Sequence, residues 1–159
     1  MSILSKTLTG GLLFALSSYT CAAQWTSETI KDDFTDETKV FASVLSDAGF
    51  RDGFIHMGCY PGKSFEVKVG AGKYIGSKRI PNNVKYRVDK NEPVEMTMNS
   101  TSKRYVYMND ANSKFVRDLL DGKSSVVVQL TSYDYDTSKA KFSLKGSTKA
   151  IKQVLDACK

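Results

Sequence analysis

Histidine is nearly absent from this sequence. The one histidine in 159 residues, His56, is the only side chain that ordinarily titrates near neutral pH. No G-x-S-x-G nucleophile motif accompanies it, so a Ser-His-Asp hydrolase is not indicated. Cys59 lies nearby, but a Cys–His nucleophile needs a thiolate and is excluded if this cysteine is oxidised. We therefore interpret His56 as a loop residue and expect no catalytic set.

Metal-ligating patterns are also sparse. Isolated cysteines and one histidine do not supply the four ligands of a structural zinc site. Asp32, Asp33, Asp36 and Glu37 gather in one turn-like segment, where they offer oxygen ligands for calcium or a carboxylate pair for glycoside hydrolysis. The EF-hand pattern is absent, however, and acidic clusters at turns are usually solvated. The sequence predicts no metal and no cofactor.

No hydrophobic run is long enough to cross a bilayer. The longest early stretch, residues 12–16, falls far short of the roughly 20 apolar residues that a spanning helix needs. It follows Lys6 and ends in the small residues Cys21-Ala22-Ala23, the arrangement of a cleavable signal peptide. We expect residues 1–23 to be removed and the protein to be periplasmic or secreted, with no transmembrane segment in the mature chain.

Lipid attachment at Cys21 is the alternative to simple cleavage. An acylated cysteine after an apolar stretch would hold the protein on a membrane. The preceding residues, Ser18-Tyr19-Thr20, lack the aliphatic residue and the small residue that this signal uses. We therefore favour cleavage before Gln24.

The mature chain is basic and of single-domain size. Removing 23 residues from 159 leaves 136, a length that suits one domain with one core, residues 24–159. Loss of Lys6 reduces the 23 bases to 22 against 17 acids, a net charge of +5. Exported proteins rarely meet nucleic acid, so an anionic partner would be a lipid headgroup, a cell-wall polymer or an acidic protein. A solubilising surface charge is the simpler alternative.

Cysteine usage predicts one disulfide. Once Cys21 leaves with the signal peptide, Cys59 and Cys158 remain in an oxidising compartment, and we expect them to be joined. The chain-entropy model gives about 4–5 kcal/mol for a loop of this length, an upper value because strain reduces it. Two free, buried thiols are the alternative.

Alternating apolar and polar residues predict an antiparallel, β-rich domain. Residues 25–30 and 40–45 form a first pair, residues 47–53 a loop, and residues 96–98 and 105–107 a hairpin. Residues 126–130, apolar on both faces, form a central strand paired with residues 140–144. The full set of expected strands is 25–30, 40–45, 65–69, 84–88, 96–98, 105–107, 126–130 and 140–144.

Two segments show helical spacing instead. Ala111, Phe115 and Leu119 recur every four residues before Gly122, and a terminal helix follows with Ser147 as its N-cap and Cys158 on its apolar stripe. The sequence therefore predicts a mainly β, α+β fold: a single antiparallel sandwich or barrel-like domain of seven or eight strands with two short helices, the second C-terminal.

Basic residues concentrate between Lys73 and Lys90, where six bases face the single acid Asp89. Alternation places Lys85 and Arg87 together on the face opposite Val84, Tyr86 and Val88. Such cations can hold an anionic partner, although the solvent face of a strand is often charged for other reasons. The candidate site for an anionic partner is Lys78, Arg79, Lys85 and Arg87, with Tyr74.

The order of these features resembles a known family. A first strand beginning with Trp, a mid-chain cysteine, the strand Val84-Lys85-Tyr86-Arg87-Val88-Asp89, the helix Phe115-Val116-Arg117-Asp118-Leu119-Leu120 and a terminal Ala157-Cys158 resemble the VasI/TagO-type proteins associated with bacterial type VI secretion. The resemblance implies an exported, accessory, non-enzymatic envelope component and no catalytic residue.

These observations favour an exported, non-enzymatic binding or accessory protein of the bacterial cell envelope. Its partner would be another envelope or secreted protein, or an anionic envelope component. Two other classes remain open: an inhibitor or immunity protein acting on another envelope protein, and a secreted hydrolase. A hydrolase would place two convergent carboxylates in a deep cleft, whereas an inhibitor would carry a protruding loop.

Overall fold

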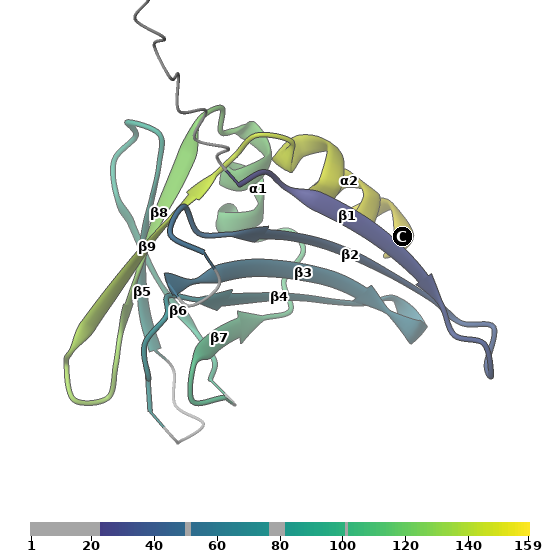
Figure 1. The fold of residues 1–159 in the computed structure, drawn as a ribbon, viewed down its shortest axis with the longest axis horizontal. Coiled ribbons are helices and arrows are strands. Elements are labelled where there is room, and N and C mark those ends of the chain that lie inside the picture. The colour runs from purple at the N-terminus through teal and green to yellow at the C-terminus, as the bar shows by residue number, and fades with distance from the viewer. Residues whose placement is uncertain (1–22, 50–51, 77–81, 101) are drawn as a thin grey trace, which may run out of the picture.

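The computed structural model describes residues 23–49, 52–76, 82–100 and 102–159. Within them, two antiparallel sheets pack together with two α-helices, which confirms the predicted fold class (Figure 1). The signal-peptide prediction and Cys21 lie outside the described residues. The strands are β1 (Thr26–Lys31), β2 (Thr38–Leu45), β3 (Phe54–Tyr60), β4 (Ser64–Gly70), β5 (Asn82–Val88), β6 (Val94–Met98), β7 (Tyr105–Met108), β8 (Ser125–Thr131) and β9 (Thr137–Ser143).

The first sheet has five strands in the order β1-β2-β3-β4-β7. Its inner face is built from rows of apolar side chains that the register aligns across the strands. One such row consists of Val44, Ile55, Val69 and Val106, each at most 2% exposed. Burial of these rows against the second sheet and the helices supplies most of the driving force for folding.

The second sheet has four strands in the order β6-β5-β8-β9. Its strands run across those of the first sheet at the left of Figure 1. Strand β5 alternates buried and exposed residues along its whole length, as the sequence predicted. Its inward-facing Tyr86 lies in register with Val128 and Ala140, and all three are buried.

Isolated bridges join the two sheets at two corners. Ser46, just after β2, pairs with Phe142 of β9, and Asn99, just after β6, pairs with Tyr107 of β7. The Asp47 N–H donates to the Lys141 carbonyl at 2.9 Å beside the first bridge. The domain is therefore sandwich-like, with partial closure at its corners.

Strand β3 was not predicted, because the sequence pattern there carries no alternation. Its inward residues, such as Ile55 and Met57, are apolar, but aromatic Phe54 and Tyr60 stand on its outward face. His56 is therefore a strand residue, and its prediction as a loop residue was wrong. The predicted hairpin of residues 96–98 and 105–107 was also wrong, since β6 pairs with β5 and β7 pairs with β4.

Helix α1 (Lys114–Asp121) packs between the sheets through Phe115, Val116 and Leu119. The Ser113 hydroxyl caps it by accepting a hydrogen bond from the Val116 N–H at 3.3 Å. The Phe115 ring meets the Tyr86 ring edge-on, with 4.9 Å between centroids. This contact fixes the helix against β5.

Helix α2 (Ser147–Ala157) lies along β1 and β2 (Figure 1) and buries Ala150, Ile151 and Val154. The predicted cap was wrong by one residue: the N-cap is Gly146, which has a positive φ of 84°, and Ser147 is the first helical residue. The Ser147 hydroxyl is buried with no hydrogen-bond partner. Neither helix in the described part of the chain is long and apolar enough to span a membrane.

The two ends of the domain are tied together. The structure contains the Cys59–Cys158 disulfide, which links β3 to the end of α2 across a sequence separation of 99. The Lys63 Nζ donates to the Ala157 carbonyl at 3.0 Å on the same side. At the other end, the Trp25 Nε1 donates to the Ser143 carbonyl at 3.0 Å. The predicted disulfide is therefore confirmed in the structure.

The two helix-start serines should respond oppositely to alanine substitution. Ser113→Ala removes a cap and should cost about 1 kcal/mol of unfolding free energy. Ser147→Ala removes a buried hydroxyl that has no partner and should leave stability unchanged or raise it by up to about 1 kcal/mol. Urea denaturation of the two variants checks the difference, and a loss for Ser147→Ala comparable to that for Ser113→Ala would contradict it.

Breaking the disulfide should loosen α2 first, because the bond fastens the last turn of this helix to β3. We expect Cys158→Ser to lose roughly 2–4 kcal/mol, seen as a melting temperature lower by several degrees or more. Hydrogen exchange should show the largest gain at the amides of Val154 and Leu155. A variant that melts like the wild type would show that the bond contributes nothing to stability.

Candidate binding surface

Four cations stand together on the outer face of the second sheet: Lys85 and Arg87 of β5, and Lys139 and Lys141 of β9. We call this group the basic face. The register places Lys85 and Lys139 on either side of Gln129, and Arg87 and Lys141 on either side of Val127. Strand geometry then spaces the four side chains at the corners of a rectangle of about 7 by 10 Å.

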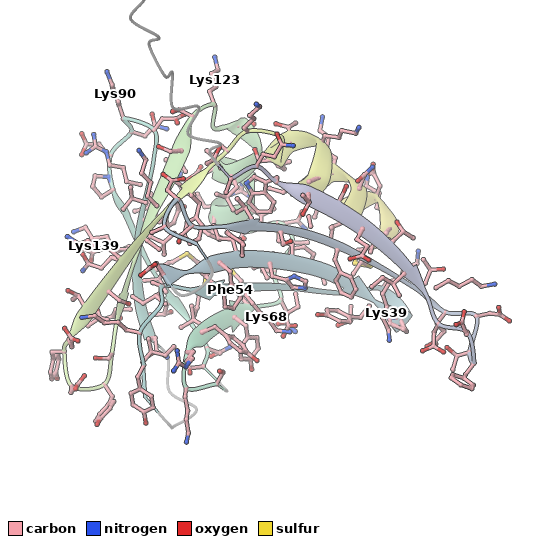
Figure 2. All side chains as sticks on the ribbon, in the orientation of Figure 1. Lys39, Phe54, Lys68, Lys90, Lys123 and Lys139 are labelled. Carbon is pink, nitrogen blue, oxygen red and sulfur yellow. A yellow bond between two sulfur atoms is a disulfide. The ribbon has the colours of Figure 1, made fainter. Side chains whose placement is uncertain are left out.

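The basic face is open and only partly neutralised. Lys85 forms an ion pair with Glu95 of β6 at 2.9 Å, with both side chains largely exposed. Arg87 donates to the Lys90 carbonyl at 3.3 Å. Among the described residues, neither Lys139 nor Lys141 has an ion-pair partner, and Figure 2 shows Lys139 pointing away from the body of the domain. The rectangle thus keeps a clear excess of positive charge.

A shallow hollow of about 510 Å³ adjoins the basic face. It lies over β6, β5 and β8, and hydroxyl and amide groups surround Lys85 and Glu95 there. The hydroxyl and amide N–H groups there can donate hydrogen bonds to carboxylate or phosphate oxygens, which accept them. Its polar lining residues are Asn83, Lys85, Glu95, Thr97, Gln129 and Thr131.

The structure describes three of the five residues of the predicted site, Tyr74, Lys85 and Arg87, and brings two of them together. Lys85 and Arg87 do project together, but Tyr74 lies elsewhere, packed edge-on against Tyr133 at the turn between β8 and β9. Lys78 and Arg79 lie outside the described residues. The prediction did not include Lys139 and Lys141. They lie near Lys85 and Arg87 because β8 pairs with both β5 and β9, and a single sequence does not reveal that strand order. The alternation in β9 alone, which exposes both lysines, was the available signal.

Asp89 fixes the end of β5 beside the basic face. Its carboxylate accepts three backbone N–H hydrogen bonds, from Lys123, Ser124 and Ser125, at 2.8–2.9 Å. The bond from Lys123, with those from Ser125 and Ser124, holds the pKa of the Asp89 carboxyl below its usual value. Asp89 thereby ties the turn after β5 to the start of β8, and keeps the two strands in register.

Tyr86 and Asp118 connect the same strand to α1. The Tyr86 hydroxyl donates to the Asp118 carboxylate at 2.8 Å, and Lys114 pairs with that carboxylate at 2.6 Å. Burial, together with the Asp118 hydrogen bond, raises the pKa of Tyr86, so its hydroxyl stays protonated and donates. The residues that carry the family resemblance in β5 and α1 are therefore engaged in holding the fold.

Three carboxylates, Asp89, Asp118 and Asp121, line a second hollow of about 440 Å³. Glycoside hydrolysis needs one carboxyl kept protonated as an acid. Asp89 is held ionised instead by its backbone hydrogen bonds, and Asp118 is engaged by Tyr86 and Lys114. Two of the three carboxylates in this hollow are therefore engaged in contacts that hold the fold.

His56 stands on the outward face of β3, opposite the face that carries Cys59. Burial first, and then the charge of Lys68, lower the pKa of His56. Its ring packs on Phe41, with 5.2 Å between centroids. Since Cys59 is in the disulfide and on the other face, the two residues do not form a nucleophile and base.

Hydrogen bonds and an ion pair within residues 31–36 hold the acidic turn between β1 and β2. Asp32 accepts hydrogen bonds from the Phe34 and Thr35 N–H groups at 2.9 and 3.0 Å, and Lys31 pairs with Asp36 at 2.6 Å. The hydrogen bond from Phe34, with that from Thr35, lowers the pKa of Asp32. In the described part of the chain, no three His, Cys, Asp or Glu side chains converge to hold a metal ion.

Comparison with protein-family models, with curated proteins and with solved structures finds no match to this chain.

The Asp89 clamp should depend on charge and therefore on pH. Asp89→Asn keeps a residue that tolerates the positive φ of 52° but removes the charge, so it should lower the melting temperature at pH 7. Because the folded pKa lies below the unfolded one, this stability is present above about pH 4 and disappears as the pH falls further. Thermal melts of both proteins from pH 7 to pH 2.5 should converge. A constant gap would contradict the charge-based explanation.

Proposed function

We propose that this chain is an exported, non-enzymatic binding protein of the bacterial cell envelope, and that it binds an anionic partner through the basic face. The VasI/TagO-type resemblance supports the first part of this proposal, an exported, accessory, non-enzymatic envelope component associated with type VI secretion; the anionic partner is inferred from the basic face alone. The observation that carries the proposal is the grouping of Lys85, Arg87, Lys139 and Lys141 on one flat, open sheet face.

The spacing of the basic face supports a collective interaction. The cations stand about 7–10 Å apart, within one Debye length at an ionic strength of 0.1 M. Several of them therefore attract an approaching anion at the same time. One exposed ion pair contributes little, whereas a group of like charges accelerates association and selects partners by sign. The polar groups of the adjoining hollow add hydrogen bonds once contact is made.

The hydrolase alternative has weaker support. In the acidic hollow, Asp89 and Asp118 accept hydrogen bonds from backbone and side-chain donors. The one histidine is part of an aromatic cluster on β3. A binding role requires no further group beyond those already on the basic face.

Reversal of the four charges should abolish capture of the partner. We would immobilise the protein, pass periplasmic extract of the source bacterium over it at 50 mM salt, and quantify the retained proteins and lipids by mass spectrometry. The variant Lys85→Glu, Arg87→Glu, Lys139→Glu, Lys141→Glu should lose at least ten-fold of the partner signal. The wild-type signal should fall steeply between 50 and 300 mM salt.

A matched control separates the basic face from overall charge. Reversing Lys103, Arg104, Lys123 and Lys149, which are exposed elsewhere on the domain, changes the net charge by the same amount. This control should retain the partner. If both variants lose it equally, the binding follows net charge, and if neither does, the basic face is a solubilising surface.

A further inference from the structure

The hairpin of β1 and β2 projects beyond the rest of the domain. Figure 1 shows its turn at the lower right, clear of both sheets and of α2. All six residues of β1 are exposed, and β1 forms the edge of its sheet. A projecting edge hairpin is available to another molecule, and its outermost residues are the ones that make first contact.

The tip of this hairpin is held in one conformation. Asp32 accepts from two N–H groups of the turn, its own N–H donates to the Glu37 carbonyl at 2.8 Å, and Asp36 donates back to the Asp32 carbonyl at 2.9 Å. Asp36 occupies the left-handed region with φ 58°. A turn ordered in this way loses little conformational entropy on binding.

That ordered turn presents an apolar ring. Phe34 is 98% exposed, more than any other large hydrophobic residue described, and nothing packs on it. Acids flank it, so residues 31–37 carry four negative charges against the single positive charge of Lys31. The tip therefore carries one exposed aromatic side chain between acidic residues, although the protein as a whole has a net positive charge.

The complementary surface lies between α1 and α2. A groove of about 590 Å³ there has apolar walls formed by Ala111, Leu120 and Leu155, with Lys152 and Lys159 at its rim. Lys159 is paired with Asp156 at 2.6 Å, whereas Lys152 has no ion-pair partner among the described residues. The groove thus combines partly buried apolar side chains with a lysine that has no ion-pair partner in the described part of the chain.

The other two hollows fit the tip less well. One is lined by Asp89, Asp118 and Asp121, which repel an acidic hairpin. The other is mostly polar, and its lysine is already paired with Glu95. Unlike these two hollows, the groove between α1 and α2 offers both an apolar contact for Phe34 and, in Lys152, a lysine that no described acid neutralises.

We propose that the groove between α1 and α2 binds the hairpin tip of a second copy of this chain, with Phe34 on Leu120 and Leu155 and with Asp33 facing Lys152. The exchange is reciprocal, so that each copy gives its hairpin and receives the other's. Reciprocity closes the assembly as a two-fold dimer and leaves no unpaired tip or groove. The proposal is independent of the basic face, which lies on the second sheet.

Sedimentation equilibrium of the purified protein from 1 to 500 µM at 50 mM salt tests the proposal. We expect a mass that rises from one chain to two and no further. Phe34→Ala should weaken the dimer at least ten-fold. At 1 µM, where the wild type is monomeric, it should leave the melting temperature unchanged, because the ring is exposed and supports no contact within the chain. Tyr135→Ala, at the tip of the hairpin between β8 and β9, is the control: Tyr135 is 88% exposed, and its loss should leave the dimer intact.

A charge exchange identifies the groove as the receptor. Asp33→Lys and Lys152→Glu should each weaken the dimer, and the double variant should recover it, because the pair is restored with opposite signs. A protein that stays monomeric at 500 µM overturns the proposal. So does a dimer that is insensitive to Phe34→Ala, a dimer lost instead on Lys139→Glu, or a double variant no better than the two single ones.

Discussion

Side chains along β5 and β9 point alternately into the core and into solvent. The packing of the core and the position of the basic face both depend on this alternation. Tyr86 and Ala140 reach the core only if Arg87 and Lys141 stand outside. The hydrogen-bond register then brings the outward residues of separate strands together. The basic face is therefore fixed by the same burial that stabilises the domain, and it cannot shift without a slip that would bury four charges.

Much of the fold was predictable because its strands follow simple alternation. Strands β4 and β5 each bury one apolar face and expose one polar face, so their two-residue alternation is recognisable in the sequence. Strand β3 was not predicted, because the aromatic side chains on its outward face remove the difference in hydrophobicity between its two faces. The pairing of β6 with β5 and of β7 with β4 also escaped prediction, since the turn-rich residues between β6 and β7 read as a hairpin.

Half of the candidate site was predictable for the same reason. Lys85 and Arg87 sit two residues apart on one strand, a relation that the sequence states directly. Lys139 and Lys141 are some fifty residues further along the chain. They lie on the same face only because β8 stands between β5 and β9 in the sheet, and this strand order cannot be deduced from the sequence. The start of α2 shows the reverse case: Ser147 has the identity of a cap, but Gly146 takes that position because it accepts the left-handed conformation.

The joining of the two ends of the domain also constrains the order of its folding. Trp25 bonds to Ser143 and Lys145, and Cys59 bonds to Cys158. These contacts close loops over most of the domain, with sequence separations of 118 for Trp25–Ser143 and 99 for Cys59–Cys158. A fragment that stops before Ser143 therefore lacks both the acceptors of Trp25 and the partner of Cys59, whichever strands it already contains.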